Sequence, residues 1–198
     1  MMKVMKQVAL AVPFTVLFAS AAFAHPGHGG ATDMSNGFMH PFSGLDHILA
    51  MIAVGLYAAQ LGGRATWMLP AAFVSAMIAG GVIGYAGLSI PMVEQGIALS
   101  VIVMGVAIAL GLKMPAATGM ALVAGFAIFH GHAHGSEGAE AASFALYAAG
   151  FIAATALLHA VGVALGRAID RLEACQSQLI RQLAGSAGAV AGIALLAG

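Results

Sequence analysis

The sequence predicts an all-α membrane protein, a compact bundle of six transmembrane helices. Of its 198 residues 61% are hydrophobic and only 7% are charged, whereas about a quarter of the residues of a soluble domain are charged. Mean hydropathy is +0.98. Six apolar runs, each near the ~20 residues that a bilayer requires, are the predicted spans, and none alternates apolar and polar residues as a barrel strand does: Leu45–Leu61, Trp67–Ala86, Val93–Leu112, Ala117–His134, Ala142–Gly166 and Leu183–Gly198.

Residues 1–24 have the layout of a secretory signal peptide. Two lysines precede an apolar run from Val8 to Ala19, and the small-residue site Ala22-Phe23-Ala24 follows it. The apolar run is short for a spanning helix, and Pro13 interrupts it. Cleavage at this site would make His25 the first residue of the mature protein, although an uncleaved anchor is an alternative.

A histidine-rich lead-in, residues 25–44, is predicted to follow outside the cytoplasm. Because its glycines, histidines and prolines show no helical period, we expect an extended segment. The free α-amine and the imidazole of His25 can chelate one metal ion, and His28 could add a third nitrogen. The other interpretation is a flexible tail whose histidines bind nothing.

The basic residues predict the orientation of the spans. With an exported N-terminus, every lysine and arginine of the mature chain falls in a loop that faces the cytoplasm, and the outward loops hold none: Arg64, Lys113, Arg167, Arg171 and Arg181. This distribution is the positive-inside pattern of multi-pass membrane proteins. Six spans then place the N-terminus and the C-terminus outside the cytoplasm, with residues 45–198 forming one transmembrane domain.

Two further patterns concern the contacts between helices and the cytoplasmic surface. Gly80 with Gly84, and Gly188 with Gly192, have the small-xxx-small spacing that lets helix backbones approach closely. The stretch Arg167–Gln182 mixes charged and apolar residues, which predicts a short interfacial helix on the cytoplasmic side.

Composition also excludes several classes of function. The net charge is zero and no basic patch exists, so nucleic acid is not an expected partner. The lone Cys175 excludes a disulfide framework and a thiolate metal cage. Because no Gly-rich loop ends in Lys-Ser or Lys-Thr, ATP hydrolysis of the P-loop kind is not expected.

The stretch Phe129–Glu137, FHGHAHGSE, brings three histidines and a carboxylate to the end of an apolar run. On a helix, His130 and His134 lie one above the other, Glu137 follows on the same face, and His132 points to the opposite side. Two imidazoles and a carboxylate make half of a divalent-metal site. The alternative is that these side chains only cap a helix end.

A second cluster, His40, Asp46 and His47, stands just before the first predicted span. Pro41 disfavours a regular helix at His40, so the chain can fold back toward Asp46 and His47. Ser43 and Asp46 also have capping-box spacing, which is the alternative role of that carboxylate. The predicted topology places both clusters at the same extracytoplasmic depth, where they could share one metal ion.

These two patterns resemble the signatures of the HupE/UreJ family of nickel or cobalt permeases, which are associated with hydrogenase and urease maturation. The cluster of His40, Asp46 and His47 matches His-x5-Asp-His, and residues 129–137 match Phe-His-Gly-x-Ala-His-Gly-x-Glu at every specified position. The resemblance implies a permease domain for nickel uptake across the bacterial inner membrane rather than an enzyme. The predicted topology places the motifs on the periplasmic side, and the missing P-loop motif predicts uptake without ATP hydrolysis. The expected partners are the lipid bilayer and a divalent ion, and the donor atoms alone equally admit cobalt, zinc or copper.

Two other functions fit the same residues. An intramembrane zinc hydrolase would use the histidines and carboxylates to activate water, with Glu137 as the base. A metal sensor or chaperone facing the periplasm would bind the ion without transporting it. The sequence does not decide whether His132, Glu94 at the start of the third span or His159 deep in the fifth takes part in metal binding.

Overall fold

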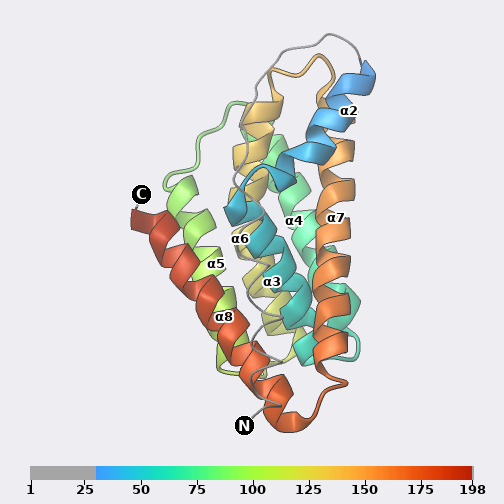
Figure 1. The fold of residues 1–198 in the computed structure, drawn as a ribbon. Coiled ribbons are helices and arrows are strands. Elements are labelled where there is room, and N and C mark those ends of the chain that lie inside the picture. Colours follow the sequence, from blue (N-terminus) through green and yellow to red (C-terminus); the bar gives the residue numbers. More distant parts are fainter. Residues whose placement is uncertain (1–29, 198) are drawn as a thin grey trace.

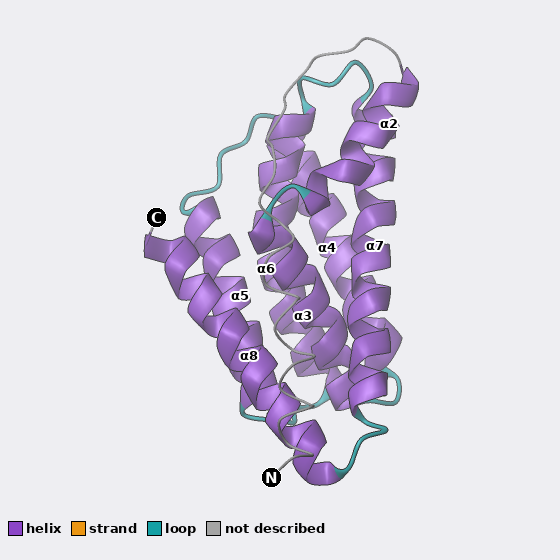
Figure 2. Ribbon diagram, in the orientation of Figure 1, coloured by secondary structure: helices purple, strands orange, loops and turns teal. Residues whose placement is uncertain are grey.

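The computed structural model describes residues 30–197, and their regular structure is entirely helical (Figures 1 and 2). Within those residues the elements are α2 (Gly30–Met39), the 3-10 helix η2 (His40–Phe42), α3 (Leu45–Leu61), α4 (Ala65–Tyr85), α5 (Val93–Ala109), α6 (Ala116–Gly138), α7 (Phe144–Ile169) and α8 (Ala174–Ala197). This confirms the all-α prediction for that part of the chain. The predicted signal peptide and the candidate ligands His25 and His28 lie outside the described residues.

Four helices of the described chain, α4, α6, α7 and α8, are long and apolar enough to cross a membrane. Residues 33–42 together with α3 would make a fifth span, bent by 78° at its break. The apolar α5 has 17 residues and is shorter than the others. The fold is therefore a bundle with at least four membrane-capable helices, while the count of six spans and their orientation stay predictions.

Helices α4 and α6 pack against each other most extensively, because glycines let their backbones touch. A Cβ atom added to Gly84 would lie 2.2 Å from the carbonyl oxygen of His132, and one added to Gly131 would lie 2.0 Å from that of Met77. Such close contact is what the spacing of Gly80 and Gly84 predicted. It leaves little freedom for α6 to rotate, so the direction of its histidines is set by this packing.

The lead-in is helical, so the prediction of an extended segment is wrong for its described part. Helix α2 lies along α7 (Figure 1), where Asp33 Oδ2 accepts a hydrogen bond of 2.7 Å from the backbone N–H of Ser143. Gly37 contacts the α7 backbone, since a Cβ there would lie 2.0 Å from the carbonyl oxygen of Tyr147. Tertiary packing, rather than an intrinsic helical pattern, stabilises this short helix.

The predicted interfacial helix Arg167–Gln182 is also wrong. Its first residues complete α7, and its last ones form the first turns of α8, so the final helix begins earlier than expected. Arg181 is buried and donates to Asp170 Oδ1 at 2.6 Å and to Gln60 Oε1 at 3.4 Å. The mixture of charged and apolar residues thus reflects a buried polar contact between α8 and α3. This contact is at the end of α3 opposite to His47.

Candidate metal centre

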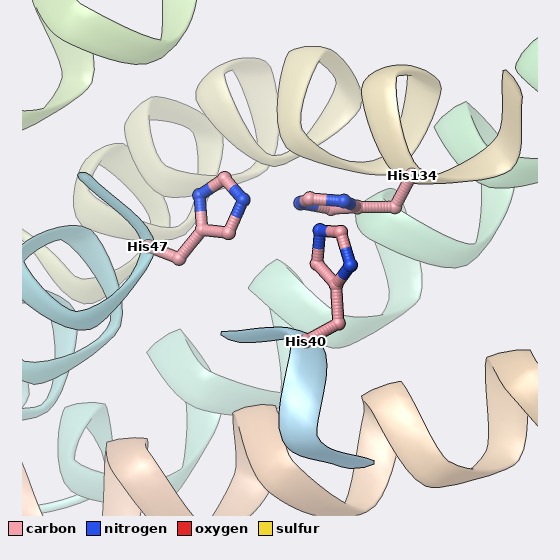
Figure 3. Close-up of side chains that lie close together, drawn as sticks. All are labelled: His40, His47 and His134. Atoms are coloured by element: carbon pink, nitrogen blue, oxygen red, sulfur yellow. The ribbon is translucent and has the colours of Figure 1, made fainter. Parts of the chain in front are cut away.

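Three histidines from three separate elements converge at one end of the bundle. His40 begins η2, His47 lies in the first turn of α3, and His134 lies near the end of α6 (Figure 3). One nitrogen atom of each ring lies within 4.8 Å of the chosen nitrogens of the other two. Tetrahedral ligands with metal–nitrogen distances of about 2.1 Å lie roughly 3.4 Å apart. A modest inward movement of the three rings would therefore complete a three-nitrogen site.

Two carboxylates contact the same imidazoles. Glu137 Oε2 lies 3.0 Å from His134 Nδ1 and 3.2 Å from His40 Nε2. Asp46 Oδ2 lies 2.9 Å from His47 Nδ1. Since a carboxylate accepts, the contact with Glu137 places the proton of His134 on Nδ1, and the buried Nε2 has no hydrogen-bond partner among the described residues. That arrangement, with a carboxylate behind the ring and a free nitrogen in front, is typical of metal-binding histidines.

The turn between α2 and α3 brings His40 back over the start of α3. Pro41 stands in the first turn of η2, and the hydroxyl of Ser43 donates to the carbonyl oxygen of His40 at 2.6 Å. The N-cap of α3 is Gly44, without a side-chain cap. The capping-box interpretation of Ser43 and Asp46 is therefore wrong, because the serine bonds backward along the chain and Asp46 contacts a histidine instead.

His130 lies beside the three-histidine cluster rather than within it. It is fully buried one turn before His134, and its ring centroid is 5.9 Å from that of His47. Its Nε2 lies 3.1 Å from the hydroxyl of Ser100 in α5. Sequence reasoning missed Ser100, and a single serine inside the apolar run of the third predicted span was the only signal that pointed to it.

The remaining candidates lie outside this cluster. His132 Nε2 contacts the carbonyl oxygen of Leu88 at 2.7 Å and so ties α6 to the loop between α4 and α5, away from His130 and His134 as the helical spacing predicted. Glu94 is exposed in the first turn of α5. His159 is buried in α7.

Comparison with known proteins covers nearly the whole chain. The family described as HupE / UreJ protein matches residues 12–195. Protein HupE of Rhizobium leguminosarum bv. viciae is 45% identical over 196 residues, which are 96% of this chain and 94% of that protein. No solved structure matches the chain. By both matches the chain belongs to the HupE/UreJ family, whose members are generally associated with nickel and cobalt transport and are accessory or transport proteins rather than enzymes.

Proposed function

We propose that this protein takes up a divalent transition-metal ion across the bacterial inner membrane without hydrolysing ATP, and that its main substrate is nickel. The imported ion would be used in the maturation of a metalloenzyme such as a hydrogenase or a urease. The observation that carries the proposal is the convergence of His40, His47 and His134, with carboxylates behind the rings, at one end of a membrane-capable bundle. Membership of a family associated with nickel and cobalt transport supports it.

In this proposal the three imidazoles replace part of the water shell of the arriving ion. Glu137 holds His134 in the tautomer that leaves its Nε2 free, Asp46 lies beside His47 Nδ1, and the negative charges of both carboxylates offset part of the charge of the ion. Among the described residues, the lysines and arginines follow α3 and α5, lie in the last turn of α7 or just beyond it, or lie in α8. They are thus far from the start of α3, where His47 lies, and the capture site keeps an excess of negative charge that attracts cations.

The membrane potential would supply the driving force. An interior-negative potential is worth about 2.3 kcal/mol per charge per 100 mV. For a dication that is about 4.6 kcal/mol, which corresponds to accumulation on the order of a thousandfold. Uptake of this size needs no nucleotide-binding site.

The hydrolase alternative requires a carboxylate that is free to act as a base toward metal-bound water. Glu137 Oε2 instead contacts two imidazoles, His134 Nδ1 and His40 Nε2. The geometry therefore favours binding of the ion over activation of water. A sensor or chaperone would have the same site, and only transport distinguishes it from a permease.

The deciding experiment is uptake of radioactive nickel by proteoliposomes that contain only this protein. A potassium gradient with valinomycin sets the potential, and empty liposomes together with His134→Ala proteoliposomes are the controls. We expect accumulation that grows with interior-negative potential, needs no ATP and is absent from both controls. Nickel that binds to the protein but never enters the vesicles would overturn the permease proposal in favour of a sensor or chaperone.

A further inference from the structure

His159 is a buried histidine that the outer metal centre does not use. Only 1% of it is exposed, and neither of its ring nitrogens has a hydrogen-bond partner within the described residues. A buried polar atom without a partner is costly and rare in native proteins, and it often marks a bound water or ion. Inside a membrane-capable helix the cost is greater, since lipid offers no hydrogen bonds.

Two rows of side chains face each other along the contact between α4 and α7 at this level. Thr155 and His159 lie one turn apart on α7, and Phe73 and Met77 have the same spacing on α4. The rings of Phe73 and His159 meet edge to face with centroids 5.0 Å apart. The buried hydroxyl of Thr155 donates to the sulfur of Met77 at 3.8 Å. The contact thus places an imidazole, a hydroxyl and a thioether along one buried seam.

This seam is adjacent to the outer metal centre. The ring of Phe73 touches His130 as well as His159, with centroids 5.6 Å apart for the first pair. Met77 and His134 line the same cavity of about 80 Å³ between α4, α6 and α7, and apart from Tyr147 its other lining residues are apolar or glycine. An ion that leaves His134 therefore finds the imidazole of His130 one turn away on α6, and the cavity offers open space beside Met77.

We propose that Met77, Thr155 and His159 form a second, inner station for the metal ion, to which it moves from the outer histidines. This inference rests on the proposed transport function. The rings of Phe151 on α7 and His134 touch, with centroids 4.2 Å apart. His159 follows Phe151 on α7 by eight residues, or about 12 Å of helix. His159 thus lies further along α7 than Phe151 by close to half of the ~30 Å thickness of a hydrocarbon core.

The ligand types explain what such a station would do. Imidazole and thioether favour the later transition metals, whereas magnesium, calcium and manganese prefer oxygen ligands. Thr155 can rotate its hydroxyl to present a lone pair in place of the proton that it now gives to sulfur. Unlike the outer centre, the inner set contains no carboxylate, so it holds a dication less strongly and releases it more readily, as conduction requires. The inner station would act as a selectivity step.

The test compares His159→Phe, Met77→Leu and Thr155→Val in the full-length protein, with Met104→Leu as a control for a buried methionine on α5. Nickel binding is measured by equilibrium dialysis over a range of concentrations, with the tighter class of sites assigned to the outer centre, and uptake is measured in proteoliposomes. We expect binding to the outer centre to be unchanged in all four. Uptake should fall at least about tenfold in His159→Phe, the smallest loss typical of removing a group that supports a metal site. Uptake should fall less in Met77→Leu and Thr155→Val, and it should stay normal in the control Met104→Leu.

Competition by manganese separates a ligand from a packing residue. The manganese concentration that halves nickel uptake should fall in Met77→Leu and stay the same in Met104→Leu, because loss of the thioether removes a preference for nickel. A packing defect would slow uptake without changing this concentration, and that result would overturn the inner station. Wild-type uptake by His159→Phe would overturn it too, leaving the permease proposal intact. Failure of the wild-type protein to transport nickel would instead overturn the proposed function.

Discussion

Glu137 offers the finest test of the outer metal centre, because one of its oxygens contacts two candidate ligands. Glu137→Gln keeps the size of the side chain but removes the charge that holds His134 Nδ1 at 3.0 Å and His40 Nε2 at 3.2 Å. Loss of a supporting carboxylate typically weakens metal binding 10- to 100-fold, or by about 1.4–2.7 kcal/mol. The side chain is 54% exposed, so solvent screening favours the lower end, about tenfold.

Isothermal titration of the purified full-length chain with nickel measures this loss, and Glu140→Gln is the matched control. Glu140 is an exposed carboxylate just beyond α6, so its removal changes the net charge equally without touching a histidine of the cluster. We expect Glu137→Gln to raise the Kd about tenfold above that of the control. Equal Kd values for the two variants would refute the supporting role. A loss far above a hundredfold would instead make Glu137 a ligand itself.

Three further predictions concern the histidines, the packing of α6 and pH. His47→Ala and His134→Ala should each abolish most nickel uptake, and the double variant should be no worse than either, since ligands of one ion act as a unit; multiplicative losses would indicate two separate sites. Gly135→Ala should lower the thermal unfolding temperature in detergent, at a cost of about 1–3 kcal/mol, because its Cβ would lie 2.1 Å from the carbonyl oxygen of Gly81. Gly125→Ala, where a Cβ meets nothing within 4 Å, should be neutral or stabilising, and equal destabilisation by the two would contradict the packing argument. Nickel affinity should fall as the pH is lowered, because protons compete with the ion for the imidazole nitrogens; an affinity that does not change with pH would argue against imidazole ligands.

Apolar runs and motif spacing predicted the helices α3 to α7, and with them the helices that carry His47 and His134. The predicted spans that begin at Leu45 and Val93 correspond to α3 and α5, which begin at the same residues. The i, i+4 spacing on α6 placed His130 and His134 on one side, with His132 on another. Such features depend on local periodicity, which a single sequence displays directly.

Features that depend on distant contacts could not be predicted in the same way. Helix α2 is stabilised by its docking on α7 through Asp33 and Gly37, and neither contact is visible from composition. The sequence around Arg181 is typical of an interfacial segment, and only the three-dimensional structure shows that Arg181 bonds to Asp170 and Gln60. For the same reason the sequence did not separate ligands from supporting groups: which ring nitrogen Glu137 contacts is a fact of three-dimensional geometry.

The most direct test of the outer metal centre is anomalous diffraction at the nickel absorption edge from crystals of the full-length protein grown with nickel. We expect the strongest anomalous peak among His40, His47 and His134, at about 2.1 Å from one nitrogen atom of each. Asp46 and Glu137 should remain on the far nitrogens of their rings. A strongest peak bound by other residues, with these three imidazoles empty, would contradict the assignment of the centre and with it the capture step of the proposed transport.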